Sequence, residues 1–124
     1  MGVYGIQLAS LVFNDDKPTD IKAVGHLNEE GVDMAISASM AYTNGRTATI
    51  VLQALTNLRN EAFMIGTKGT IHLPNFWCPD SINLPNGSQS VALPKSTREF
   101  LHINAAGLVY EANEVRECLK KGKI

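Results

Sequence analysis

Few side chains in this sequence have a type and spacing that could carry chemistry. Three histidines, His26, His72 and His102, lie far apart, and none has a carboxylate at the spacing of a metal-binding pair. Each is therefore interpreted as a surface or sheet histidine. Tyr4 is the one phenol in the stretch Gly2–Phe13, in which only Gln7 and Ser10 are otherwise polar, and a buried phenol needs a hydrogen-bond partner. From the residues alone, Tyr4 is interpreted as a core tyrosine.

Two cysteines, a glycine turn and an aromatic pair complete the candidates. Cys78, between a tryptophan and a proline, could be a reactive thiol, but no cationic residue is adjacent, so packing is the better interpretation. Cys118 lies near an apolar stripe and is interpreted as a core residue. Gly66-Thr-Lys-Gly69 is too short for a phosphate-binding loop and lies between strand-like segments, which predicts a hairpin turn. Phe76-Trp77 is either local packing beneath a loop or an anchor in an interface.

The elements that must position these residues are mainly strands. Met34–Tyr42 alternates so that its even positions form one face, and Asn44-Gly45 is typical of a two-residue hairpin turn. The chain returns through the β-branched run Thr47–Leu55 and continues through Glu61–Ile65 and Thr70–Leu73. The pattern predicts an antiparallel meander in a broad sheet whose second face is also apolar. Such a face would make the chain dimerise or aggregate.

Two helices are expected at the ends of the chain. Gly2–Phe13 is apolar on nearly all sides, so we expect this helix to be buried on nearly all sides. Since so apolar a helix stands at the start of the sequence, we also expect these residues to be part of a longer protein. Ala106–Lys121 carries apolar residues at steps of four, three and four, which predicts an amphipathic helix with Gly122 as its C-cap.

Shorter segments fill the remaining stretches. Asp20–Leu27 is predicted to be a short strand at a sheet edge. Ser81–Leu84 and Ser90–Leu93 flank a Pro-Asn-Gly sequence and predict a second hairpin, followed by an irregular connection over Pro94–Asn104. The expected fold class is α+β, with an open, predominantly antiparallel sheet and flanking helices.

Composition bounds the possible functions. The 124 residues are 44% hydrophobic and 19% charged, a globular balance that fits one domain. A net charge of −1 offers no electrostatic footprint for nucleic acid or an anionic membrane. No apolar run reaches the roughly 20 residues of a membrane span, and the opening residues lack a secretory signal pattern. We therefore expect a cytoplasmic protein without nucleic-acid or membrane partners.

Several segments, taken together, resemble a known family. They are Gly2–Phe13, Lys17-Pro18, Glu30–Asp33, Gly66–Gly69, Phe76–Pro79, Tyr110–Ala112 and Glu117–Leu119. In this order they resemble the C-terminal domain of the dimeric dihydrodiol dehydrogenases, NADP-linked enzymes that also act as D-xylose dehydrogenases. That family belongs to the glucose–fructose oxidoreductase and inositol dehydrogenase superfamily. The Gly-Thr-Lys-Gly turn is superfamily-wide, whereas the Trp-Cys-Pro segment and the Gly-Val-Tyr start are more specific.

The resemblance implies roles for four residues. Tyr4 matches the tyrosine that transfers a proton to or from the substrate oxygen, beside a lysine of a Glu-Lys-Pro motif in an N-terminal Rossmann domain that binds NADP. His102 lies in the stretch that contributes to the substrate pocket, and Trp77 lies at or near the dimer contact. His26 stands at a dimer-interface position where the family prefers arginine. A homodimer through the open sheet face is implied.

The sequence departs from the family in what it lacks. The Gly-rich nucleotide loop and the Glu-Lys-Pro lysine are absent from residues 1–124. We therefore expect these residues to be a single, incomplete C-terminal sheet domain that binds no cofactor and is inactive when isolated from its Rossmann domain. The alternative is a non-catalytic sheet module that dimerises or binds a partner.

Overall fold

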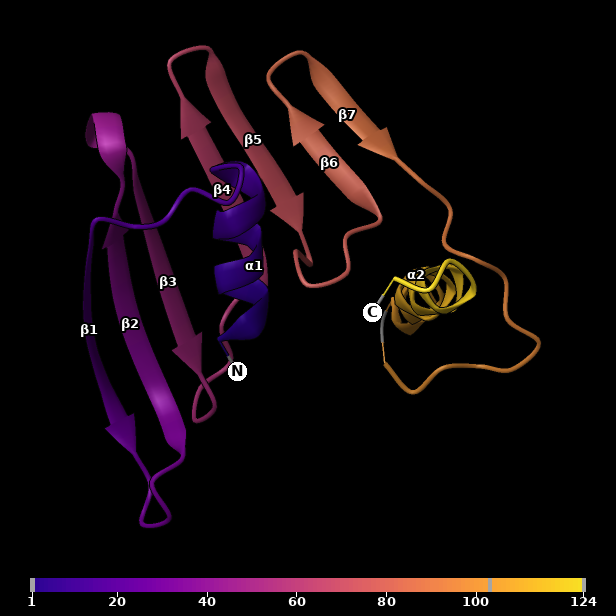
Figure 1. The fold of residues 1–124 in the computed structure, drawn as a ribbon, viewed down its shortest axis with the longest axis horizontal. Helices are drawn as coiled ribbons and strands as arrows, with labels where there is room; N and C mark the ends of the chain where they lie inside the picture. Colours follow the sequence, from indigo (N-terminus) through magenta and orange to yellow (C-terminus); the bar gives the residue numbers. More distant parts are fainter. Residues whose placement is uncertain (1, 103, 124) are drawn as a thin grey trace. The chain divides into compact units, whose positions relative to one another are not determined.

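The computed structural model describes residues 2–102 and 104–123, which belong to two compact units divided between Arg59 and Asn60. Each unit contains an antiparallel sheet and one α-helix (Figure 1). The expected α+β class with predominantly antiparallel strands is therefore confirmed. Among the described residues, no helix combines the length and the apolar character needed to cross a membrane.

The first unit is a helix lying on a three-stranded sheet. Its elements are α1 (Val3–Val12), β1 (Asp20–Leu27), β2 (Asp33–Ala41), the 3₁₀ turn η1 (Thr43–Gly45) and β3 (Thr47–Gln53). The strand order is β1-β2-β3, so β1 is an edge strand, as predicted. The prediction of a two-residue turn between β2 and β3 is wrong, because the amide of Tyr42 donates to the carbonyl of Arg46 and Thr43–Gly45 form a three-residue loop. Asn44 at φ 62° and Gly45 at φ 70° adopt the left-handed backbone that these two residue types tolerate better than most.

The even positions of β2 face α1, as the alternation predicts. The buried core of this unit consists of Ala9, Met40 and Tyr42, with Phe13, Ala48 and Ile50 packed against it. Met40 pairs with Ala48 across the sheet, which places the even positions of β3 on the same face. A Cβ at Gly5 would lie 2.8 Å from the Cγ2 atom of Ile50. The glycine therefore allows α1 to lie directly on β3.

The opposite face of this sheet is rich in hydroxyl groups. Ser39 pairs with Thr49, and their side-chain oxygens lie 3.5 Å apart, while Ser37 pairs with Val51. Both serines and Thr49 are exposed. The prediction of an apolar second face is wrong for this sheet, because small polar side chains occupy the odd positions of β2 and alternate with the apolar ones.

The second unit is a four-stranded sheet followed by a helix. Its elements are β4 (Glu61–Gly66), β5 (Gly69–Pro74), β6 (Ser81–Leu84), β7 (Gly87–Ser90), the 3₁₀ turn η2 (Ala105–Gly107) and α2 (Leu108–Lys120). The strand order is β4-β5-β6-β7, and Gly66 pairs directly with Gly69, which confirms the predicted hairpin turn.

Two expectations about these strands are wrong. The meander is not continuous, because β3 and β4 belong to separate hydrogen-bonded sheets among the described strands and residues 54–60 form no strand between them. The last strand is Gly87–Ser90 rather than Ser90–Leu93. The turn is tight, with Leu84 pairing directly with Gly87, so the return strand begins at once.

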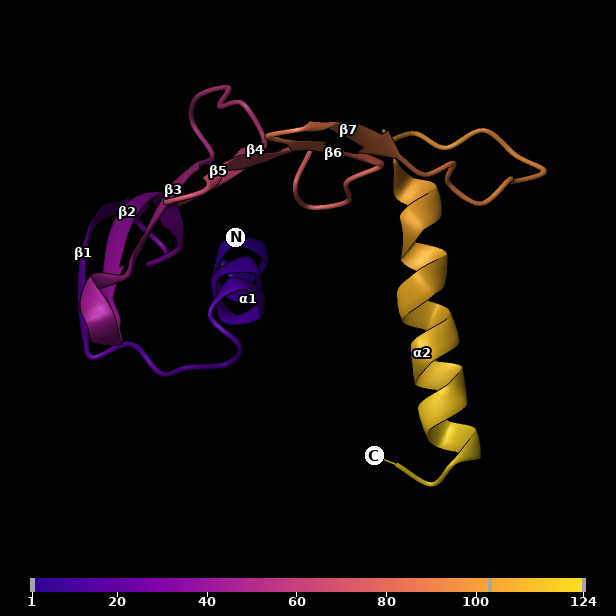
Figure 2. The same ribbon diagram turned by 90° about the horizontal axis from the view of Figure 1, so that it is seen from above.

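The C-terminal helix ends as expected and keeps an uncovered apolar stripe. α2 is one continuous helix (Figure 2), and Gly122 follows it at φ 63°. The amide of Lys123 donates to the carbonyl of Cys118 at 2.9 Å, the bond typical of a glycine-terminated helix. Leu108 and Leu119 are each 61% exposed, so the apolar stripe of α2 has little cover within the described chain. The interpretation of Cys118 as a core residue is therefore wrong, because no residue of α2 is buried and Cys118 is only partly covered.

Candidate functional site

Tyr4 lies on the face of α1 that points away from its sheet. Gly5 and Ala9 face the strands, whereas Tyr4, Gln7 and Leu11 follow each other at steps of three and four on the opposite side. The side chain of Tyr4 is 52% exposed. The interpretation of Tyr4 as a core tyrosine is therefore wrong, and its phenol can reach a substrate or another part of the protein.

A cluster at the other end of α1 fixes the helix on the sheet. The rings of Phe13 and Tyr42 lie 4.3 Å apart between centroids, and the Arg46 guanidinium lies 5.2 Å from the centroid of the Phe13 ring. Arg46 also pairs with Asp16, with 2.6 Å between Nη2 and Oδ2. Because α1 is fixed at this end and approaches β3 closely at Gly5, the backbone that carries Tyr4 has a defined position.

The surroundings of Tyr4 on α1 are apolar and uncovered. Val3, Ile6 and Leu11 are 65%, 58% and 74% exposed. We expected this helix to be buried on nearly all sides, but Ala9 is the only buried residue within α1. An apolar face of this extent on one helix is typical of a surface that another part of a protein covers. Covering it would place the phenol in a dry environment.

The resemblance-derived residues of the second unit lie in and beside irregular segments. Trp77 is half-buried in the turn between β5 and β6, and His102 is exposed near the end of the irregular stretch that precedes η2. Cys78 donates a hydrogen bond from its thiol to the carbonyl of Asn104 at 3.1 Å. The thiol therefore has a backbone partner within the second unit.

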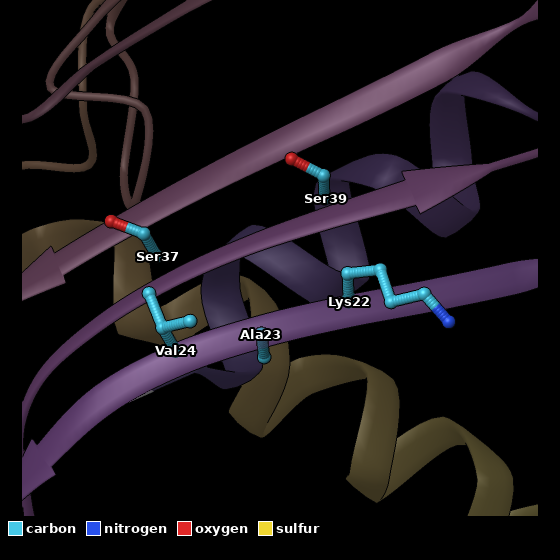
Figure 3. A pocket seen from close by; sticks show the side chains of 5 residues that line it. All are labelled: Lys22, Ala23, Val24, Ser37 and Ser39. Carbon is cyan, nitrogen blue, oxygen red and sulfur yellow. The ribbon is translucent and has the colours of Figure 1, made fainter.

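His26 lies on β1, near a shallow concavity on the face opposite α1. The concavity has a volume of about 400 Å³ and is lined by Lys22, Ala23, Val24, Ser37 and Ser39 (Figure 3). His26 is exposed and pairs with Ala35 beside a bulge. Lys22 Nζ lies 3.1 Å from Asp20 Oδ1, and both side chains are largely exposed, so the concavity is a surface feature and not an enclosed site.

Sequence reasoning missed a polar row across the second sheet. Asn83 Nδ2 lies 3.1 Å from His72 Nδ1. The other ring nitrogen, His72 Nε2, lies 3.7 Å from Glu61 Oε2, while Ser88 donates to Asn83 Oδ1 at 2.7 Å. The row fixes the sheet where β5 and β6 pair at His72 and Asn83, so His72 is a sheet histidine, as predicted.

The described residues do not fit a nucleotide phosphate or a metal ion. Gly66 and Gly69 close a hairpin between antiparallel strands, whereas a dinucleotide fingerprint needs a turn from a strand into a helix. Within residues 2–102 and 104–123, no three His, Cys, Asp or Glu side chains gather at metal-binding distance. Two of the described phenols are exposed on helices, Tyr4 on α1 and Tyr110 on α2, and Tyr4 is the one that lies on the apolar helix packed against the first sheet.

Comparison with known proteins places these observations in context. Residues 1–72 match the GFO/IDH/MocA C-terminal domain family. The chain is 34% identical over 122 residues to trans-1,2-dihydrobenzene-1,2-diol dehydrogenase of Mus musculus, and 37% and 34% identical over 123 residues to those of Xenopus laevis and Homo sapiens. Each of the three comparisons covers 98% of the chain and 37% of the relative.

A solved structure shows the same fold. The aldose-aldose oxidoreductase from Caulobacter crescentus, complexed with glycerol, superposes with a TM-score of 0.67 at 19% identity. The comparison covers 98% of this chain and 36% of that one. The chain therefore spans little more than a third of the length of the proteins that it matches.

Proposed function

The chain belongs to the GFO/IDH/MocA C-terminal domain family, and from that premise we propose that it forms the substrate-side domain of an NADP-linked oxidoreductase. The relatives named above are dehydrogenases, and the chain covers 37% of their length. The described residues do not fit a dinucleotide, so the proposal assigns the cofactor to a Rossmann domain outside them. The isolated chain is then inactive.

Tyr4 is the proposed proton-transfer residue, and its exposure on a fixed helix is the observation that carries the proposal. When a carbinol is oxidised to a carbonyl, the hydroxyl proton must pass to a base, and in reduction an acid must protonate the developing alkoxide. A phenol whose oxygen reaches the substrate can serve both directions. A lysine ammonium from the covering domain would stabilise the phenolate in the dry environment that the α1 face provides once covered.

The proposed substrate is a vicinal diol or an aldose. The matched mammalian and amphibian relatives carry a trans-diol of dihydrobenzene in their names, and a D-xylose-like aldose offers the same pair of adjacent carbon–oxygen bonds. Trp77 supplies an aromatic surface for a ring or a sugar face, and His102 supplies a hydrogen-bonding imidazole. Both are proposed to line the substrate pocket.

Assembly and location belong to the same proposal. A homodimer would use an open sheet face, with His26 and Trp77 at the contact. The small side chains of Ser37 and Ser39 would allow a second copy to approach the first sheet closely. The protein is proposed to be cytoplasmic, since Cys78 and Cys118 are both free thiols, as is usual in a reducing compartment.

Two measurements test the proposed function. The whole natural polypeptide that contains this chain should reduce NADP⁺ when a trans-dihydrodiol or D-xylose is added. Residues 1–124 alone, titrated with NADPH, should show no saturable change in the fluorescence of Trp77. Absence of turnover with either substrate class would favour a non-catalytic sheet module, and saturable quenching at micromolar NADPH would contradict the assignment of the nucleotide site to another domain.

A further inference from the structure

Two residues that are 26 positions apart hold each other by reciprocal hydrogen bonds. The Cys78 thiol donates to the carbonyl of Asn104 at 3.1 Å, and the Asn104 amide donates from Nδ2 to the carbonyl of Cys78 at 2.9 Å. We call this pair the Cys78–Asn104 clasp. It joins the turn after β5 to the segment just before η2, and all four participating groups are at least partly buried.

The backbone on both sides is shaped for this contact. Asn104 has φ 58° and ψ 11°, a left-handed conformation that asparagine tolerates better than most residues. The amide of Cys78 donates to the carbonyl of Asn75 at 2.9 Å, which fixes the turn that presents the thiol. A Cβ at Gly107 would overlap the Cys78 Sγ atom, so glycine is required where η2 passes the thiol.

His102 is tied to the same point of the structure. Its carbonyl accepts a hydrogen bond from the amide of Ala105 at 3.4 Å, and the amide of Gly107 donates to the carbonyl of Asn104 at 2.9 Å. Between the end of β7 and this point, residues 91–102 have no helix or strand. The clasp therefore anchors the C-terminal end of this irregular stretch to the turn after β5.

We propose that Cys78 and Asn104 are positioning residues that hold His102 in place for substrate binding. The inference rests on the proposed function, in which His102 lines the substrate pocket. An imidazole at the end of an irregular stretch samples many positions unless its backbone is fixed, and an unfixed hydrogen-bonding group binds a substrate less tightly. In this proposal the clasp acts through the backbone at Asn104, two residues after His102, and the clasp itself need not contact the substrate.

Asn104→Asp tests the clasp in the whole natural polypeptide. Aspartate also tolerates a left-handed backbone, but its carboxylate cannot donate to the Cys78 carbonyl. Loss of this bond should raise KM for the diol or aldose roughly tenfold, with kcat changed less than about threefold. Two variants of Cys78 test the other bond of the clasp. Cys78→Ser keeps a donating hydroxyl, so KM should stay within about twofold of its original value. Cys78→Ala removes the donor, so KM should rise roughly tenfold, as in Asn104→Asp.

His102→Ala shows whether the effect passes through the imidazole. Alone it should raise KM roughly tenfold, but in the Asn104→Asp background it should add less than about twofold, because the imidazole is already misplaced. Full additivity of the two changes would overturn the positioning role.

A second readout does not depend on activity. Trypsin can cut after Lys95 and Arg98, which are both exposed in the stretch that the clasp anchors. Asn104→Asp and Cys78→Ala should speed this cleavage several-fold, and Cys78→Ser should not. Unchanged cleavage would overturn the clasp as an anchor. If the protein has no dehydrogenase activity, the proposed function fails and the role of His102 with it, while the cleavage rates still decide whether the clasp holds the stretch.

Discussion

Replacing Leu11 by alanine should have a small effect in residues 1–124 and a large effect in the whole natural polypeptide. Leu11 lies on the outward face of α1 and is 74% exposed, so only about a quarter of its side chain is covered within this chain. Fully burying a leucine stabilises by about 1.5–3 kcal/mol, so the substitution should cost the isolated chain only about 0.4–0.8 kcal/mol.

In the whole polypeptide the same substitution should be more damaging. If another domain covers the outward face of α1, Leu11 becomes a core residue, and truncating a core leucine to alanine costs roughly 2–5 kcal/mol. The difference between the two contexts measures the cover that α1 acquires. Amide hydrogen exchange of the peptide carrying α1 reports the local opening free energy in both proteins.

Met40→Ala provides the matched control. Met40 is only 7% exposed and packs inside the first unit, so its truncation should cost roughly 2–5 kcal/mol in both contexts. An equal and small cost of Leu11→Ala in the two proteins, with Met40→Ala behaving as expected, would show that the outward face of α1 stays uncovered. That result would refute the reasoning that places a catalytic pocket there.

Two further outcomes follow from local charges. The hydrogen bond from Cys118 to Glu114, followed by partial burial and the negative charge of that carboxylate, raises the pKa of the Cys118 thiol above its ordinary value. Glu114→Ala should therefore lower this pKa and shift the pH profile of iodoacetamide alkylation at Cys118 to lower pH. The control Glu111→Ala should leave the profile unchanged. An unshifted profile for Glu114→Ala would contradict the role of Glu114 in raising the pKa. Arg46→Gln should lower the free energy of unfolding of the first unit by about 0.5–1 kcal/mol in chemical denaturation, because its ion pair with Asp16 is half-exposed and screened by solvent. The loss should be smaller at high salt, and the effect should be coupled to that of Asp16→Asn. Independent effects of the two substitutions would show that the pair contributes nothing.

Local patterns in the sequence predicted most of the helices and strands and the core-facing side of β2. Alternation over Met34–Tyr42 predicted that Met40 and Tyr42 share a face, and both lie in the core beside Ala9 of α1, because successive side chains of an extended chain point to opposite faces. Asn44-Gly45 and the Gly66–Gly69 turn were recognisable because both need residues that tolerate tight backbone geometry. Such information is contained in neighbouring residues.

Non-local relations could not be obtained in the same way. The pairing of Cys78 with Asn104 joins residues 26 positions apart, and no spacing rule connects them. The available signal was an asparagine just before a helix, a residue that tolerates a left-handed backbone. The separation of β3 and β4 into two sheets is also non-local, because the sequence of a strand does not specify which other strand it pairs with.

The candidate site was obtained from resemblance rather than from residue patterns. A tyrosine among apolar side chains is usually a core residue, and the sequence alone predicted this for Tyr4. In the structure its side chain is half-exposed. The apolar character of α1 was visible, but which face would stay uncovered depends on Gly5 and its approach to Ile50. That approach is a tertiary contact and cannot be derived from periodicity.

The turnover of Tyr4→Phe in the whole natural polypeptide tests the central claim most directly. Tyr110→Phe is the matched control, because Tyr110 also lies on a helix and is 55% exposed, against 52% for Tyr4. Loss of the proton-transfer group should lower kcat for the diol or aldose by roughly 10²–10⁴-fold in Tyr4→Phe, with less than a twofold change in Tyr110→Phe. A Tyr4→Phe protein that turns over as fast as the Tyr110→Phe protein would contradict the account.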